Sequence, residues 1–127
     1  MVSPRHQCRV LVIEDDRSIG PLVELVLERD GLETVVVESG EKGLALLREE
    51  TFTVVVLDLM MSGVNGWDIL HRIARDRLTL SVIVATAVSP KQRGDLDPSI
   101  VKAVIDKPFD IKELAKAVKL CCHGKTQ

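Results

Sequence analysis

The chain contains five short apolar runs rich in valine and isoleucine, and these runs restrict its possible folds more than any other feature. They lie at residues 10–13, 34–37, 54–57, 82–85 and 101–105. None of them alternates apolar with polar residues, so each indicates a strand that is buried on both faces. Strands of this kind are typical of parallel sheets that carry helices on both sides.

Segments with helical periodicity lie between the apolar runs. Apolar residues three or four positions apart form four stripes: Ile19, Leu22, Val23, Val26 and Leu27; Leu44, Leu46 and Leu47; Trp67, Leu70, Ile73 and Ala74; and Ile111, Leu114, Ala115 and Val118. Gly31 is expected to end the first helix and Ser39 to cap the second. Asp110 and Glu113 form an N-terminal capping pattern for the last. This alternation of strand and helix predicts an α/β fold with a doubly wound, five-stranded parallel sheet.

The interval between Ser89 and Ile100 is different from the other connections. It contains two prolines and a glycine, and Leu96 is its only apolar residue. We therefore expect about five helices, of which the fourth is short or irregular. No internal repeat, linker or low-complexity tract divides the 127 residues, so we expect a single domain with a core at about 9–120 and a tail at 121–127.

Charge and aromatic content argue against a nucleic-acid binder. The chain has 17 basic and 19 acidic residues, and no run of lysine or arginine of the kind that contacts phosphate backbones. Its only aromatic residues are Phe52, Trp67 and Phe109, which are too few for base stacking. Residues 1–10 resemble neither a signal peptide nor a membrane span, so we expect a soluble protein.

The cysteines indicate a reducing, cytoplasmic setting. Cys8, Cys121 and Cys122 show no CxxC spacing, and the adjacent pair cannot bond to each other without unusual strain. A chain of this length needs no disulfide or metal to fold. Cys121 and Cys122 are expected to finish the last helix, with one of them facing the core. The histidines show no metal-ligand spacing with the cysteines and are expected at the surface: His6, His71 and His123.

Polar residues follow four of the five apolar runs. They are Glu14, Asp15 and Asp16 after the first, Asp58 after the third, Thr86 after the fourth, and Asp106 and Lys107 after the fifth. Each alone has an ordinary explanation as solvated surface, strand end or helix cap. The carboxyl ends of parallel strands, however, meet at one edge of the sheet, where ligands bind in such folds. We therefore expect these side chains to lie together.

The residue types at this edge favour phosphoryl transfer to a carboxylate. Glu14, Asp15 and Asp58 would repel one another unless a hard cation lay between them. Mg²⁺ is bound by one or two carboxylates together with carbonyls, waters and phosphate oxygens. Thr86 and Lys107 would supply a hydrogen bond and a positive charge to a phosphoryl group. One of the carboxylates would then be the nucleophile.

The motifs at the strand ends match a known family in order and spacing. They are VLVIEDD at 10–16, VVVLDLMM at 54–61 followed by Asn65-Gly66, VATA at 84–87 and DKPFD at 106–110. The chain resembles the receiver domain of two-component response regulators from about Arg9 to Val118. This resemblance implies a flavodoxin-like sheet with the strand order 2-1-3-4-5.

The resemblance also implies the role of each residue near the metal. Asp58 would be the phosphoacceptor, which takes the phosphoryl group from a phosphohistidine. Asp15 and Asp58 would bind Mg²⁺ directly, the main-chain carbonyl of Met60 would be a third ligand, and Glu14 would reach the ion through water. Asp16 would face solvent or cap the first helix.

Three further residues would contact the phosphoryl group by the same resemblance: Thr86, Lys107 and the N–H of Ala87. The domain would be a signalling switch rather than an enzyme, although it would catalyse its own phosphorylation and a slow dephosphorylation. Its partners would be a histidine kinase or phosphotransfer protein and a downstream protein target. No contact with nucleic acid and no membrane insertion are expected, and the location would be cytoplasmic.

The chain departs from the family pattern at specific positions. Ser62 stands where proline is usual. Met60 and Val88 are apolar where side chains border the path of the hydrolytic water, which predicts slow loss of phosphate. Val104 stands where an aromatic ring usually turns inward upon activation. If the domain is a working switch, phosphorylation must be reported by something other than that ring.

Two other functions remain open at this stage. A receiver-like adaptor would act by protein contact without phosphate, and Val104 together with the irregular interval gives this alternative some weight. A phosphatase with an aspartyl nucleophile would carry a second aspartate two residues after the first, where this chain has Met60. The nine residues after Val118 hold no output domain, so the chain is a stand-alone receiver or a piece of a longer protein.

Overall fold

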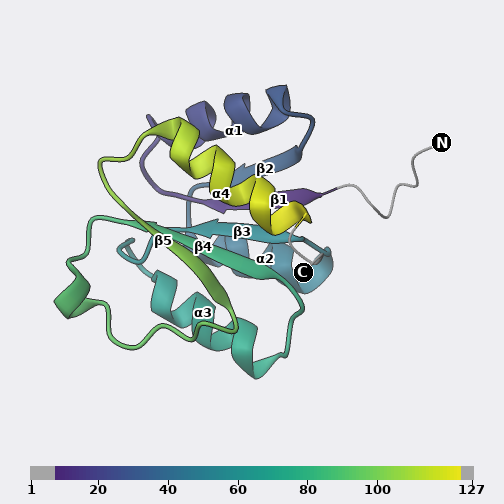
Figure 1. The fold of residues 1–127 in the computed structure, drawn as a ribbon. Helices are drawn as coiled ribbons and strands as arrows, with labels where there is room; N and C mark the ends of the chain where they lie inside the picture. The colour runs from purple at the N-terminus through teal and green to yellow at the C-terminus, as the bar shows by residue number, and fades with distance from the viewer. Residues whose placement is uncertain (1–7, 124–127) are drawn as a thin grey trace.

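A computed structural model describes residues 8–123, which form one five-stranded parallel sheet with helices on both faces (Figure 1). The strands are β1 (Arg9–Ile13), β2 (Glu33–Val37), β3 (Val54–Leu57), β4 (Ser81–Thr86) and β5 (Val101–Asp106). They lie in the order β2-β1-β3-β4-β5, and each neighbouring pair is parallel. The doubly wound sheet and the strand order implied by the resemblance are both confirmed.

The helices lie in two layers. They are α1 (Gly20–Arg29), α2 (Gly40–Glu49), α3 (Gly66–Arg75) and α4 (Ile111–His123). Figure 1 shows α1 and α4 on one face of the sheet and α2 and α3 on the other. Within residues 8–123 there are thus four α-helices rather than about five, because the expected fourth helix is reduced to one 3₁₀ turn, η2 (Pro90–Gln92). No helix in this range is long and apolar enough to cross a membrane.

The non-alternating runs are explained by two hydrophobic cores, one on each face of the sheet. In β1, Val10 and Val12 belong to the core beneath α1 and α4, whereas Leu11 and Ile13 belong to the core above α2 and α3. All four side chains are at most 1% exposed. Successive side chains of a strand point to opposite faces, so a strand that is covered on both sides must be apolar at every position.

The helix boundaries follow the capping residues identified in the sequence. The Ser39 hydroxyl accepts a hydrogen bond from the Lys42 N–H at 3.2 Å, at the start of α2. Gly31 has a φ of +85°, a conformation that favours glycine, just after α1 ends. The Asp110 carboxylate accepts a hydrogen bond from the Lys112 N–H at 2.8 Å, at the start of α4. These local signals are confirmed.

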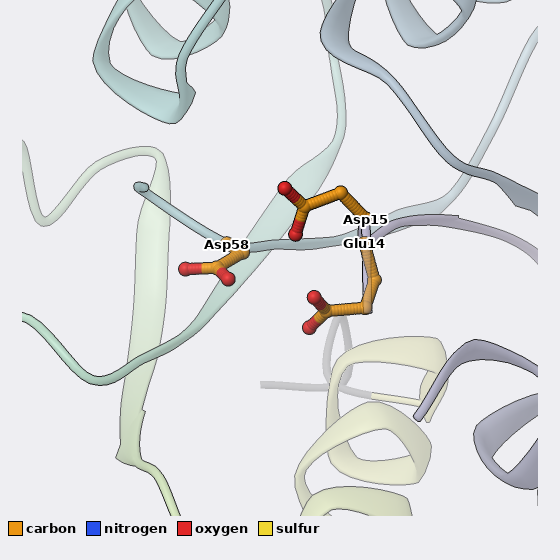
Figure 2. A group of neighbouring side chains, drawn as sticks. All are labelled: Glu14, Asp15 and Asp58. Atoms are coloured by element: carbon orange, nitrogen blue, oxygen red, sulfur yellow. The ribbon is translucent and has the colours of Figure 1, made fainter. Parts of the chain in front are cut away.

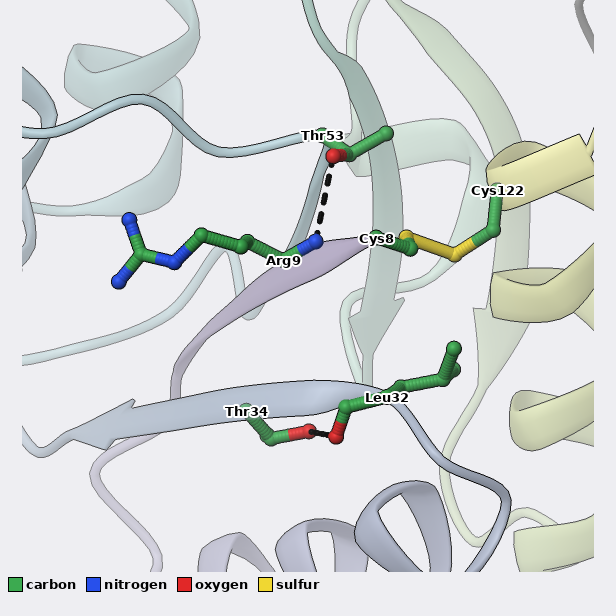
Figure 3. Close-up of a disulfide and its surroundings, with 6 residues drawn as sticks. All are labelled: Cys8, Arg9, Leu32, Thr34, Thr53 and Cys122. Carbon is green, nitrogen blue, oxygen red and sulfur yellow. Dashed lines mark hydrogen bonds between the residues drawn. A yellow bond between two sulfur atoms is a disulfide. The ribbon is translucent and has the colours of Figure 1, made fainter. Parts of the chain in front are cut away.

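A disulfide joins Cys8 to Cys122, a pairing that the cysteine pattern did not predict (Figure 3). Cys8 precedes β1, and Cys122 lies in the last turn of α4. The two residues are 114 positions apart in the sequence. They meet because α4 runs back across the sheet and brings its carboxyl end to the amino end of β1. As expected, Cys121 and Cys122 do lie at the end of the last helix, which continues into the segment expected to be a tail.

Candidate functional site

The carboxyl ends of β1 and β3 bring three acidic side chains together. Glu14 and Asp15 directly follow β1, and Asp58 directly follows β3. The Asp58 N–H donates a hydrogen bond to the Ile13 carbonyl at 3.3 Å, so the sheet ladder continues to the start of the site. Figure 2 shows the three carboxylates turned toward a common region. The sequence-based expectation that these residues lie side by side is therefore met by the sheet geometry.

The carboxylates are close enough to share a cation. Glu14, Asp15 and Asp58 each offer an oxygen within 4.8 Å of the others. Glu14 is 5% exposed and Asp58 is 7% exposed, whereas Asp15 is open to solvent. Burying like charges together is unfavourable without a counter-charge. A donor set made only of oxygens fits a hard cation such as Mg²⁺.

Lys107 supplies part of the counter-charge. Its Nζ donates to Glu14 Oε1 at 2.7 Å and to Asp58 Oδ2 at 2.8 Å. The Lys107 N–H also donates to the Thr86 carbonyl at 2.9 Å, which anchors the lysine at the end of β4. A single ammonium group balances only one of the three negative charges. The cluster therefore keeps a net negative charge that a divalent cation can neutralise.

Burial and hydrogen bonds together shift the pKa values of Glu14 and Lys107. Burial is the main cause that raises the pKa of Glu14, and its hydrogen bonds from Lys107 and the Asp16 N–H oppose that shift only in part. Burial acts to lower the pKa of Lys107, but the hydrogen bonds to Asp58 and Glu14 outweigh it and raise this pKa above its ordinary value of 10.5. Lys107 is therefore a permanent cation at neutral pH.

We expect Glu14→Gln to change how the metal-free protein responds to pH. Because the folded-state pKa of Glu14 is raised above 4.5, its stabilising contribution is complete below about pH 4.5 and is lost as the pH rises through the folded-state value. In EDTA, the free energy of unfolding of the variant should decline less between pH 5 and pH 8 than that of the wild type, as measured by urea denaturation. A steeper decline in the variant would contradict this assignment.

Thr86, Ala87 and Met60 lie around the same edge. Thr86 is fully buried at the end of β4, and its hydroxyl oxygen accepts a hydrogen bond from the Val88 N–H at 3.2 Å. Ala87 is exposed beside it. The Met60 N–H donates to Asp58 Oδ1 at 3.2 Å, and the Met60 side chain is 62% exposed. The main chain after Asp58 therefore fixes one carboxylate oxygen while Lys107 contacts the other.

The Asn65-Gly66 pair fixes the loop after Asp58 against α3. The side-chain oxygen of Asn65 accepts a hydrogen bond from the Asp68 N–H at 2.9 Å. The Asp68 carboxylate accepts one from the Asn65 N–H at 3.2 Å, which completes a capping box. A Cβ at Gly66 would lie 2.5 Å from the Asp58 carbonyl oxygen. Only glycine allows this close approach of the helix to the loop that carries the acid.

Arg93 is a residue of this region that the sequence did not reveal. Its Nε donates to the Val88 carbonyl at 3.0 Å, and its guanidinium pairs with the Asp106 carboxylate. Its own carbonyl accepts a hydrogen bond from Trp67 Nε1 at 2.7 Å. The Arg93 side chain is only 13% exposed. It therefore joins the loop after Thr86, the end of β5 and the start of α3.

Val104 and Asp16 lie where the sequence-based expectations put them. Val104 lies on β5 and is 37% exposed, so its side chain is not buried in the interior. Asp16 is open to solvent just before α1, where its carboxylate accepts hydrogen bonds from the Ser18 N–H and hydroxyl at 2.9 and 2.6 Å. His71 is exposed, as expected, whereas His6 lies outside the described residues.

An apolar hollow of about 430 Å³ lies beside Lys107. Ile19, just before α1, and Leu22 on α1 line one part of it, and Phe109 lines another. Leu22 is 49% exposed, and Leu25 on the same helix is 58% exposed. An apolar surface of this kind next to a charged site is suited to contact with another protein.

The comparisons with known proteins identify the family. A family model for the response regulator receiver domain matches residues 10–119, and the chain therefore belongs to this family. The uncharacterized transcriptional regulatory protein YcbL of Bacillus subtilis is 31% identical over 92% of this chain and 52% of its own length. The response regulator ArlR of Staphylococcus saprophyticus is 30% identical over 94% of this chain and 54% of its own length. The chain thus spans about half the length of these curated relatives.

Solved structures agree with this assignment. The receiver domain of the Francisella response regulator 1452 superposes with a TM-score of 0.86 at 27% identity, covering 94% of this chain and 99% of that one. The response regulator TrrA of Thermotoga maritima, solved in complex with Mg²⁺ and BeF, superposes with a TM-score of 0.79 at 29% identity, covering 91% of this chain and 99% of that one. The fold is thus that of a receiver domain over nearly its whole length.

Proposed function

We propose that this receiver domain accepts a phosphoryl group on Asp58 from a phosphohistidine of a histidine kinase or phosphotransfer protein. The observation that carries the proposal is the position of Lys107 Nζ, 2.8 Å from Asp58 and 2.7 Å from Glu14 at the carboxyl edge of the sheet. A buried acid beside a fixed cation can act as a nucleophile toward a group that brings its own negative charge. The modified domain would then signal to a protein partner through a change in conformation.

Each polar residue at the edge has a distinct task in this transfer. A carboxylate oxygen of Asp58 forms the new bond to phosphorus, and the bond from phosphorus to the donor imidazole nitrogen breaks with its electron pair on that nitrogen. Lys107 neutralises charge on the phosphoryl oxygens, while the Thr86 hydroxyl and the Ala87 N–H donate hydrogen bonds to them. The Met60 N–H holds the acceptor carboxylate in place. Positioning and charge neutralisation supply most of the catalysis in such transfers.

The acidic cluster also supports a metal requirement. Asp15, Asp58 and the Met60 carbonyl would hold Mg²⁺, with Glu14 acting through water. The ion would neutralise the crowded carboxylates and the phosphoryl oxygens. The binding of Mg²⁺ and BeF by the similar receiver TrrA supports this choice of ion. The Lys107 contacts with Glu14 and Asp58 hold these two acids in position.

The donor protein is expected to cover the apolar hollow beside Lys107. A phosphohistidine can approach Asp58 only from the open side of the carboxyl edge, because the strands occupy the other side. Leu22 and the hollow beside it lie next to that route. Apolar contact there would hold the donor ring close to the acid for transfer.

An adaptor that acts without phosphate is the second candidate. Two observations favour it: Val104 is exposed on β5, and the expected fourth helix is reduced to η2. Both changes lie in the region that would report phosphorylation. An adaptor would bind its partner equally well with and without phosphate, so partner affinity separates the two functions.

A phosphodonor assay tests the proposed function. The protein is incubated with acetyl phosphate in Mg²⁺ or in EDTA, and its intact mass is measured. We expect a gain of one phosphoryl group in Mg²⁺ and no gain in EDTA. An unchanged mass in Mg²⁺, also after incubation with phosphorylated histidine kinases, would favour the adaptor.

Arg93 is expected to carry the conformational signal in place of the missing aromatic ring. Arg93→Ala removes the contacts to Val88 and Asp106 and loosens the segment that accepts the Trp67 hydrogen bond. Beryllofluoride should then produce a change in Trp67 fluorescence less than half that of the wild type, while the phosphorylation rate stays within about threefold, a free-energy difference under 1 kcal/mol. Lys91→Ala, an exposed residue of the same segment, is the control. An unaltered fluorescence response in Arg93→Ala would rule out this role.

A further inference from the structure

We propose that Cys8 and Cys122 form a reversible redox site, which exchanges with low-molecular-weight thiols and disulfides such as glutathione. The Cα atoms of the two residues are 5.6 Å apart, which lies within the usual range for a disulfide. Figure 3 shows the bond joining the start of β1 to the end of α4. This site lies at the opposite end of β1 from Glu14 and is separate from the phosphoryl site.

The fold places both cysteines independently of the bond. The Cys8 carbonyl accepts a hydrogen bond from the Glu33 N–H at 3.3 Å, so Cys8 is held by the sheet. Cys122 is held by α4, whose Leu114 and Val118 are at most 1% exposed in the core against the sheet. The two sulfurs therefore stay close when the bond is broken, and the bond can form again without refolding of the domain.

The two cysteine residues differ in their exposure to solvent. Cys8 is only 8% exposed, whereas Cys122 is partly exposed on the last turn of α4. An incoming thiolate can therefore reach Cys122 more easily than Cys8. Exchange depends on such access to one sulfur of the bond.

Reduction of the protein disulfide takes two thiol–disulfide exchange steps. A glutathione thiolate attacks the Cys122 sulfur, the bond between the two protein sulfurs breaks, and Cys8 leaves as a thiolate that takes up a proton. A second glutathione thiolate then attacks the mixed disulfide and releases Cys122 as a thiol. The protein disulfide is reduced to two thiols, and two glutathione molecules are oxidised to one glutathione disulfide. Oxidation of the protein is the same sequence in reverse.

Cys121 is not expected to take part in the exchange. It is the free cysteine next to Cys122 and is half-buried. Burial raises the pKa of its thiol, and a hydrogen bond with Ser81 opposes this only in part. Because the thiolate is the reactive form, Cys121 is a poor nucleophile near neutral pH.

The proposed function argues against a permanent disulfide between Cys8 and Cys122. This part of the inference rests on the proposed function. Phosphohistidine donors are made from ATP inside cells, where thiols are kept reduced. A disulfide that forms there is usually transient and responds to oxidants. Closing a loop of 114 residues restricts the unfolded chain strongly, so oxidation would stabilise the domain and fix the end of α4.

Equilibration with glutathione tests the redox site. The native protein is incubated in mixtures of reduced and oxidised glutathione and quenched with acid, the free thiols are alkylated after the protein has been unfolded, and the intact mass is measured. We expect a continuous shift between a form with one alkylated cysteine and a form with three as the mixture becomes more reducing. The melting temperature of the oxidised form should be higher by roughly 10 °C.

Three variants separate the possible outcomes. Cys8→Ser and Cys122→Ser should both remove the dependence of the melting temperature on oxidation, and Cys121→Ser should retain it. The phosphorylation rate at Asp58 should be the same for both redox forms, because the five residues of β1 separate the two sites by roughly 16 Å. A bond that stays closed in excess glutathione until the protein unfolds, or one that forms in no mixture, would overturn the proposal. Either result is independent of whether Asp58 is phosphorylated.

Discussion

Asp58→Ala is expected to abolish phosphoryl acceptance from acetyl phosphate, with no gain in intact mass at any Mg²⁺ concentration. The reason is that the variant lacks the carboxylate that contacts both Lys107 Nζ, at 2.8 Å, and the Met60 N–H, at 3.2 Å. Glu14 still pairs with Lys107 at 2.7 Å, so the variant should stay folded. Its melting temperature is expected to be equal to or above that of the wild type in EDTA, because one of three crowded charges is gone.

Asp95→Ala provides the matched control for this variant. Asp95 is an exposed aspartate in the segment before β5, and it lies outside the acidic cluster. The control should be phosphorylated at the wild-type rate. Phosphorylation of Asp58→Ala at more than a few per cent of that rate would place the acceptor on another residue.

Lys107→Ala is expected to have the second largest effect. The variant removes the ammonium group that pairs with both Glu14 and Asp58, whose side chains are 5% and 8% exposed. The phosphorylation rate should fall by roughly 10²- to 10³-fold, as is typical when one charge-stabilising donor is lost. In EDTA the free energy of unfolding should fall by roughly 3–5 kcal/mol, since two buried carboxylates are left without their cation.

The two effects of Lys107→Ala can be separated by adding Mg²⁺. The ion should restore most of the stability, measured by urea denaturation, but not the phosphorylation rate, measured by mass. Lys102→Ala, an exposed lysine on the same strand, should change neither quantity appreciably. A Lys107→Ala protein that accepts phosphate at the wild-type rate would show that Lys107 has only a structural role.

The parts of the fold that depend on local patterns could be predicted from the sequence. The runs at 10–13 and 54–57 indicated strands buried on both faces, because a strand between two helical layers has no solvent-facing side. Gly31 and Ser39 marked helix ends through backbone conformation and capping, which act over a few residues. Glu14 and Asp58 could be placed together because parallel strands bring their carboxyl ends to one edge.

The features that the sequence did not reveal depend on contacts between distant segments. Cys8 and Cys122 pair only because α4 returns to the amino end of β1, and no local spacing rule describes that return. Arg93 lies in a segment without periodicity, so its contacts with Trp67 and Asp106 could not be foreseen. The same segment lacks the apolar stripe that a full fourth helix would bury. Its reduction to the single turn η2 was therefore predictable, whereas the arginine contacts that hold it were not.

The position of the phosphoryl group tests the central claim most directly. The protein is incubated with acetyl phosphate and Mg²⁺, treated with borohydride, which reduces an aspartyl phosphate to homoserine, and then digested and sequenced by mass spectrometry. We expect homoserine at position 58 and at no other aspartate, with none formed in EDTA. Homoserine at Asp15 or another aspartate, or its absence from a protein that has gained a phosphoryl group, would contradict the assignment of Asp58 as the acceptor.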